Sequence, residues 1–237
     1  MKQLFLHIGY PRTGSKTLQF SLFKKHPDIN YLGRFPNRKI SHFPFLEKIF
    51  LYDDENYNKE KVDILKEFNE LEFNWSKTNI ISDEFFILRD ILHNQKVLKK
   101  SIFRLNEICK INSISLKVFL NIRNQEEIIK SLYFATYQTS FSSDAKTLLE
   151  YLKGNINDKY LENFINYFDY QEKFSLISRI IGKENTTIFL YENLRDSSED
   201  YYETLSKYLN IDKKLTLRIT KDVHHHKMDY FLKMDPQ

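Results

Sequence analysis

Residues 3–17 read QLFLHIGYPRTGSKT and decide the fold. The first six are an apolar run typical of a buried strand, Gly9 opens a turn, and from Ser15 apolar residues recur at helical spacing to about Lys25. A strand, a glycine-bounded turn and a helix in this order place a row of backbone N–H groups at a helix N-terminus. Oriented N–H donors and the helix dipole bind phosphate there. The stretch therefore predicts an anion-binding loop.

The side chains of this turn also suit an anion. Two cations flank Gly14, a residue without a Cβ that lets the backbone approach a ligand closely, and hydroxyl groups supply further donors. The candidate binding residues are Arg12, Thr13, Gly14, Ser15, Lys16 and Thr17. The phosphate loop of NTPases does not match this turn well, because its pattern, counted from Gly9, requires a lysine at position 15. Ser15 stands there, and Lys16 follows one residue late.

Strand and helix patterns alternate along the rest of the chain. Further strands are expected at 79–82, 115–122 and 186–190, and helices near 44–52, 59–73, 95–111, 124–138, 161–181 and 198–209. We expect loops at 31–44 and 139–160 and find no clear period over 215–237. This alternation predicts one α/β domain over residues 1–237, with three layers, α/β/α, around a central parallel sheet. Ligands of such sheets bind beyond the carboxyl ends of the strands.

Composition excludes several classes of protein. The 36 basic and 32 acidic residues give a net charge of only +4, which does not indicate a nucleic-acid partner. The single cysteine, Cys109, excludes a disulfide framework and is expected to be a buried thiol. No apolar run reaches the ~20 residues of a transmembrane helix. The first residues form a strand pattern rather than a leader, so a cytoplasmic protein is expected.

The loop resembles that of a known family. Residues 10–17, YPRTGSKT, are similar to the 5′-phosphosulfate-binding loop of sulfotransferases that use 3′-phosphoadenylyl sulfate (PAPS). Two positions depart from the family pattern: Arg12 stands where many members have lysine, and Lys16 stands where a hydroxyl residue is usual. Whether Lys16 takes over part of the usual lysine's role stays open.

A second segment also resembles the family. Its members hold the 3′-phosphate with an arginine that ends a strand and a serine on the next helix, which here are Arg123 and Ser131. Asn124 and Glu127 form a capping-box pattern at the start of that helix. Residues 188–194 and the helix that follows match more loosely, so that the resemblance runs from about residue 4 to 211.

The resemblance implies an architecture like that of P-loop NTPases and an activity of the bacterial or carbohydrate branch. It implies sulfuryl transfer from PAPS to a hydroxyl, less readily an amine, of a carbohydrate or glycolipid acceptor, with 3′-phosphoadenosine 5′-phosphate (PAP) as product and no metal. Arg12, helped by Lys16, would stabilise the transferring group. Glu84 is the first candidate for the base, Asp83 the second, and His42 the third because the cytosolic branch uses a histidine.

Two other functions stay open. Residues 80–84 faintly resemble the magnesium-binding strand of NTPases, so a P-loop kinase or NTPase that uses Mg-ATP is the first alternative. A catalytically idle module that binds nucleotide or glycan is the second. Acceptor selectivity is expected in the loops at 31–44 and 139–160, and nothing in the sequence indicates a homo-oligomer.

Some remaining polar and aromatic residues also have expected roles. His224–His226 are consecutive rather than spaced like zinc ligands, so we expect a C-terminal segment that closes over the nucleotide or the acceptor instead of a metal site. Lys221 and Lys227 are its candidate phosphate contacts. Tyr133, Phe134 and Tyr137 are candidates to flank the acceptor cleft, although core packing is the expected role of two of them.

Overall fold

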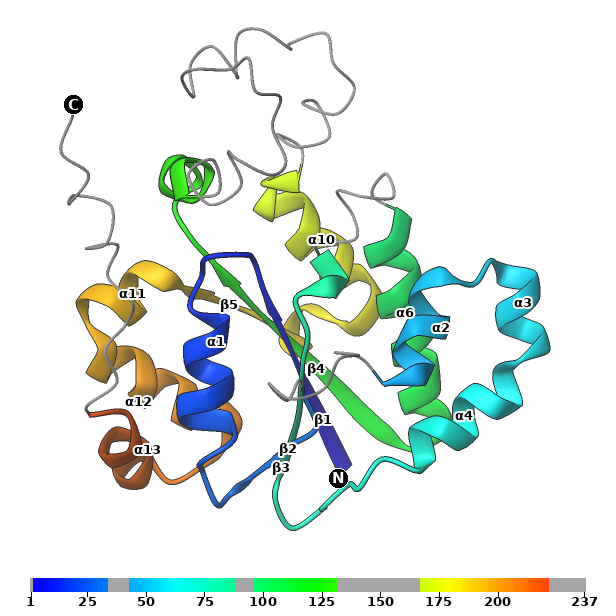
Figure 1. Cartoon of the computed structure of the whole chain (residues 1–237), viewed down its shortest axis with the longest axis horizontal. Helices are drawn as coiled ribbons and strands as arrows, with labels where there is room; N and C mark the ends of the chain where they lie inside the picture. The colour runs from blue at the N-terminus through cyan, green and yellow to red at the C-terminus, as the bar shows by residue number, and fades with distance from the viewer. Residues whose placement is uncertain (1, 34–42, 88–95, 132–166, 222–237) are drawn as a thin grey trace, which may run out of the picture.

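The computed structural model describes residues 2–33, 43–87, 96–131 and 167–221 (Figure 1). These residues form a five-stranded sheet in the order β2-β3-β1-β4-β5, in which every neighbouring pair is parallel. The strands are β1 (Lys2–Gly9), β2 (Ile29–Tyr31), β3 (Thr78–Ser82), β4 (Ile114–Ile122) and β5 (Thr186–Leu190).

The first strand lies at the centre of the sheet. Leu4, Leu6 and Ile8 face one side of β1, while Phe5 and His7 face the other, and all five side chains are buried. A strand covered on both faces reads as a continuous apolar run, which is the pattern seen in its sequence. The pairing of β1 with β3 and β4 brings the ends of three strands to one edge of the sheet.

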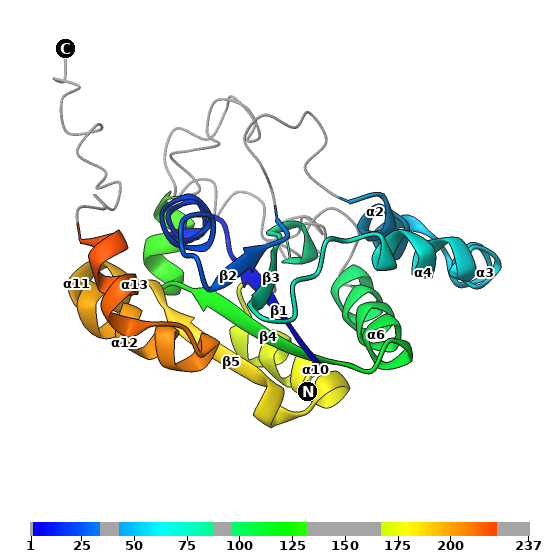
Figure 2. The same ribbon diagram turned by 90° about the horizontal axis from the view of Figure 1, so that it is seen from below.

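Helices cover both faces of the sheet, as Figures 1 and 2 show. One face packs against the buried sides of α2 (Pro44–Leu51), α4 (Lys61–Asn69), α6 (Lys96–Ile111) and α10 (Tyr170–Ile181). The other packs against η1 (Leu18–Phe23), α12 (Ser198–Leu209) and α13 (Lys213–Thr220). The predicted three-layer α/β/α architecture with a parallel sheet is therefore confirmed.

Three elements differ from the sequence expectation. The loop expected from residue 31 begins inside β2, a three-residue edge strand too short for a periodic signal. An additional helix, α3 (Asp54–Lys59), lies between the helices expected near 44–52 and 59–73. It begins with its own cap, because the Asp53 carboxylate accepts a hydrogen bond from Asn56 N. The sequence shows no clear period from residue 215 onward, so no helix was expected there. The structure nevertheless has a helix, α13, that extends to Thr220.

The helix α13 depends on a cap rather than on a broad apolar face. The carboxylate of Asp212 accepts a hydrogen bond from Leu215 N at 2.6 Å, which satisfies one of the free amides of the first turn. The sequence KKLTLRIT alternates like a strand, yet only two of its residues, Thr216 and Thr220, are buried. Local capping and contact with α12 therefore override the period of the sequence.

Cys109 is buried on α6, as expected, and burial raises the pKa of its thiol to about 12. The thiol is thus protonated and unreactive near neutral pH. Within the described ranges, no helix combines the length and the apolar character needed to cross a membrane.

Candidate functional site

The turn after β1 is held in one conformation by backbone and side-chain contacts. Tyr10 N donates to Asn121 O at 3.1 Å, and the buried Thr13 hydroxyl donates to Tyr10 O at 2.6 Å. Arg12 has a φ of 66° and Gly14 a φ of 81°, both in the left-handed region. A non-glycine residue there costs about 1–2 kcal/mol, so the fixed turn holds Arg12 in a strained backbone conformation.

Two glycines let the chain approach itself closely at this turn. A Cβ on Gly9 would lie 1.7 Å from the hydroxyl oxygen of Ser15, and one on Gly14 would lie 2.8 Å from Leu194 Cδ2. The Ser15 hydroxyl is itself buried and has no hydrogen-bond partner among the described residues. A donor of this kind at the start of a helix suits an anionic ligand, because a buried polar group needs a partner.

The helix that follows presents its first turn to the same place. It comprises α1 (Ser15–Thr17) and η1, which continues it as a π-helix, and Gly14 caps it without any side-chain hydrogen bond. The first amides of a helix lack partners within the helix, so they are donors for an anion at this end. Lys16 is exposed on this turn. The donor set fits a phosphate or phosphosulfate group.

The second predicted anchor lies directly beside the first. Arg12 Nε donates to the hydroxyl oxygen of Ser131 at 3.1 Å, across 119 residues of sequence. Arg123 Nη1 donates to the backbone oxygen of Arg12 at 3.3 Å. Ser131 is buried on the helix over residues 125–131, which starts two residues after Arg123. Two segments that were predicted separately are thus joined by hydrogen bonds at the carboxyl edge of the sheet.

Arg123 is fixed by contacts on several sides. Its guanidinium carbon lies 4.8 Å from the centroid of the Tyr191 ring, and its backbone oxygen accepts a hydrogen bond from the Tyr170 hydroxyl at 2.7 Å. Its Nε and Nη2 donate to Glu127 Oε2 at 3.3 and 3.0 Å. Arg195 Nη1 donates to the same oxygen at 2.9 Å. Two arginines therefore share one carboxylate, and no motif in the sequence predicted the second, Arg195.

The expected capping box is only half formed. Asn124 Oδ1 accepts from Glu127 N at 3.2 Å, as the pattern predicts. The Glu127 carboxylate, however, binds the two arginines instead of the backbone of Asn124, whose N–H donates to Glu192 Oε1 at 2.8 Å. Two cations within reach attract that carboxylate more strongly than one backbone amide does.

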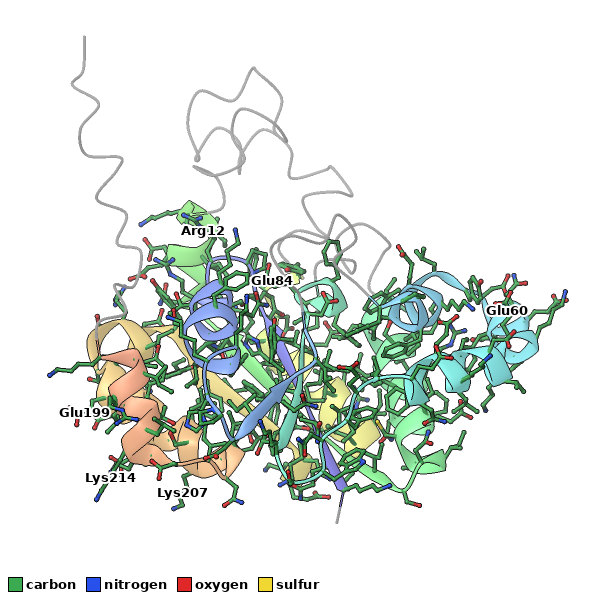
Figure 3. The ribbon with its side chains drawn as sticks, turned by 60° about the horizontal axis from the view of Figure 1, so that its bottom comes forward. Arg12, Glu60, Glu84, Glu199, Lys207 and Lys214 are labelled. Atoms are coloured by element: carbon green, nitrogen blue, oxygen red, sulfur yellow. The ribbon has the colours of Figure 1, made fainter. Side chains whose placement is uncertain are left out.

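The candidate bases lie at the end of β3. Asp83 is buried; its N–H donates to His7 O at 3.1 Å, and its carboxylate accepts from Phe85 N at 2.8 Å. Glu84 is half-buried in the turn that follows. Figure 3 shows Arg12 and Glu84 at the same edge of the molecule. The cap formed by Asp83 makes it the more structural of the two carboxylates.

A buried polar cluster beneath the loop was missed by sequence reasoning. Gln19 Nε2 donates to Ser82 Oγ at 2.9 Å, and Ser82 Oγ lies 2.7 Å from His7 Nδ1. Ser82 Oγ therefore bonds to both the Gln19 amide and the His7 ring. The cluster connects the helix after the loop with the strand that leads to Glu84. Its only signal in the sequence is a polar residue within each apolar pattern.

Burial should make the stability of the protein sensitive to acid through His7. Burial lowers the pKa of His7 to about 3, whereas an unfolded chain restores about 6.5. The unfolded state therefore binds more protons, and the stabilisation is complete above pH 6.5 and is lost as the pH falls toward 3. Between pH 7 and pH 5 this contributes a loss of about 2 kcal/mol in the free energy of unfolding.

Urea denaturation at the two pH values measures this loss. A His7→Asn variant should be less stable at pH 7 but should lose about 2 kcal/mol less than the wild type on acidification. Equal losses in the two proteins would contradict the assignment of the acid sensitivity to His7.

Several expected contributors lie outside the described residues. They are His42, Tyr133, Phe134, Tyr137, His224–His226, Lys227 and the loop at 139–160, together with most of the loop at 31–44. Lys221 is described and is exposed just after α13. The described part of the candidate site is thus built from the ends of β1, β3, β4 and β5 and from the turns that follow them.

Comparisons with known proteins place this architecture. No protein-family model and no curated protein matches the sequence. The structure is similar to that of a sulfotransferase from Alicyclobacillus acidocaldarius, with a TM-score of 0.55 and 14% identity over 90% of this chain and 83% of the other. It is also similar to the sulfotransferase domain from the curacin biosynthetic pathway, with a TM-score of 0.50 and 11% identity over 90% of this chain and 75% of that one. The chain therefore has the fold of the bacterial sulfotransferases.

Proposed function

We propose that the protein is a sulfotransferase that transfers the sulfuryl group of PAPS to a hydroxyl, less readily an amine, of a carbohydrate acceptor. The observation that carries the proposal is the junction between Arg12 and Ser131, to which Arg123 is also bonded. A nucleotide with anionic groups at both its 5′ and 3′ positions needs two anion sites side by side. The uncapped helix start with the buried Ser15 hydroxyl supports the first site, and Arg123 with Ser131 supports the second.

The residues divide the chemistry between them. The amides of the first helical turn, with Arg12 and Lys16, would bind the 5′-phosphosulfate and stabilise the charge that develops on the departing phosphate. Glu84 would accept the proton of the acceptor hydroxyl while its oxygen forms a bond to sulfur. The bond between sulfur and the bridging oxygen breaks, and that oxygen leaves with the electron pair as part of PAP. Arg12 and Lys16 would neutralise the charge on the departing phosphate, so the proposal includes no metal.

The acceptor is the least constrained part of the proposal. A carbohydrate or glycolipid acceptor is proposed because of the resemblance to the carbohydrate branch. The half-buried position of Glu84 favours an acceptor that enters from the edge of the sheet where the donor also binds.

Calorimetric titration tests the donor site. PAP, AMP and ATP are titrated separately, each with and without magnesium. PAP is expected to bind tightly without metal, and AMP, which lacks the 3′-phosphate, should bind at least about tenfold more weakly. A preference for magnesium-ATP would instead support a kinase. PAP binding without sulfuryl transfer to any of a panel of sugars would support an idle binding module.

Arg123→Ala should weaken PAP binding by roughly 1.5–3 kcal/mol, because a charge-assisted hydrogen bond to the 3′-phosphate is lost. AMP affinity should be unchanged. Arg179→Ala is the matched control, since Arg179 is an exposed arginine on α10 that donates only to Ser175 O among the described residues. Equal PAP affinity in wild type and Arg123→Ala would remove Arg123 from the nucleotide site.

A further inference from the structure

The edge of Arg123 that is best suited to a phosphate already holds a carboxylate. Nε and Nη2 are the side-on pair of a guanidinium, and both donate to Glu127 Oε2. Nη1 donates to Arg12 O. These bonds engage three of the five N–H groups that an arginine carries. A phosphate that binds the side-on pair must therefore displace Glu127.

Glu127 has a second cation to which it can turn. Arg195, at the end of α11 (Tyr191–Asp196), donates from Nη1 to Glu127 Oε2 and from Nε and Nη2 to Asp196. The Glu127 side chain is 40% exposed, whereas that of Arg123 is only 11% exposed. The carboxylate is thus the more exposed partner, and after displacement it would keep its ion pair with Arg195. Arg123 stays held by its contact with Tyr191 and by its bond to Arg12 O.

We propose that Glu127 competes with the donor's 3′-phosphate for Arg123 and that Arg195, which already binds the same carboxylate, retains it after displacement. This inference rests on the proposed function. The exchange prevents the poorly exposed guanidinium from losing its counterion when the nucleotide leaves. It also lowers the affinity for PAP, which is the product as well as the core of the donor. Glu127 therefore sets how tightly the 3′-phosphate is held and how quickly product departs.

Glu127→Gln keeps the shape of the side chain and removes its charge. PAP should bind about fivefold more tightly, because the 3′-phosphate no longer displaces a carboxylate held by two arginines. AMP affinity should not change, since AMP has no group at this position. Glu126→Gln is the matched control: Glu126 lies one residue earlier on the same helix and pairs with Lys130 rather than with Arg123. It should leave PAP affinity within about twofold of wild type.

A double-mutant cycle tests the role of Arg195. Arg195→Ala alone should weaken PAP binding about fivefold, because the displaced carboxylate then has no second cation. In the Glu127→Gln background the same change should have little effect, so the two substitutions are strongly non-additive. If the effects of the two substitutions on PAP affinity are additive, the proposed role of Arg195 in holding the displaced Glu127 carboxylate is overturned.

The outcomes separate this inference from the proposed function. If wild type binds PAP and AMP equally, the 3′-phosphate site itself fails, and the inference fails with it. If wild type prefers PAP but Glu127→Gln binds it with equal or lower affinity, only the competition is overturned, and Glu127 instead orients Arg123. Tighter binding of PAP by Glu127→Gln, with AMP unchanged, supports the competition.

Discussion

Glu84→Gln is expected to slow sulfuryl transfer by about 10²–10⁴-fold while leaving PAP affinity unchanged. The amide keeps the shape of the side chain but cannot accept the acceptor's proton. Glu84 lies half-buried at the edge of the sheet that carries Arg12, whereas the proposed donor contacts come from the loop after β1 and from the helix after β4. Initial rates with labelled PAPS, together with calorimetry with PAP, measure the two effects separately.

Asp83→Asn is the comparison that decides between neighbouring carboxylates. Asp83 caps the turn through Phe85 N, and an asparagine oxygen can replace that acceptor. We expect at most a modest loss of stability and nearly full turnover. Loss of turnover in Asp83→Asn, with activity retained in Glu84→Gln, would transfer the role of base to Asp83. Retention in both variants would direct attention to His42.

Gly14→Ala should reduce PAP affinity by at least about tenfold, because two costs combine at that position. An alanine at a φ of 81° is strained by about 1–2 kcal/mol, and its Cβ would lie 2.8 Å from the buried Leu194. Relief of the overlap would move Gly14 and the first amides of the helix away from α11. Those amides are the proposed 5′-phosphate donors, so the displacement should weaken AMP as much as PAP.

Gly182→Ala is the matched control for this backbone strain. Gly182 has a φ of 94° at the end of α10, and the nearest atoms to a Cβ there belong to the side chain of Glu184, at 2.3–2.9 Å. This variant should also be less stable in thermal unfolding, yet it should bind PAP like wild type. If both glycine variants lose PAP affinity in proportion to their stability, the effect at Gly14 is a general loss of folding and says nothing specific about the loop.

Much of the architecture could be predicted because it depends on local patterns. The residues of β1, β4 and β5 are apolar runs of strand length, and their predicted bounds agree with the structure within a residue or two. The elements that were missed depend on other forces. The edge strand β2 pairs over only three residues, and α13 depends on the Asp212 cap and on contact with α12. Burial is also not set by residue type alone, since Val62 on α4 is 77% exposed.

The candidate site was predictable where a motif names the residues and unpredictable where tertiary contacts choose the partners. Arg12, Arg123 and Ser131 could each be named from a motif, and the structure brings them into contact. The sharing of Glu127 between Arg123 and Arg195 depends on α11 lying beside the end of β4, which no local pattern encodes. The roles of these residues in binding and catalysis stay predictions.

The bond between Arg12 and Ser131 joins residues 119 positions apart, so it can form only after β1 has paired with β4. Long-range pairing of parallel strands is slow, because the loop-closure entropy is lost before the contacts form. The ability to bind PAP should therefore appear late in refolding, together with the central strand pair. A nucleotide that bridges the two anchors would bind the native state alone and raise the melting temperature with its concentration. Fluorescence of a bound analogue during refolding would then report the completion of the sheet.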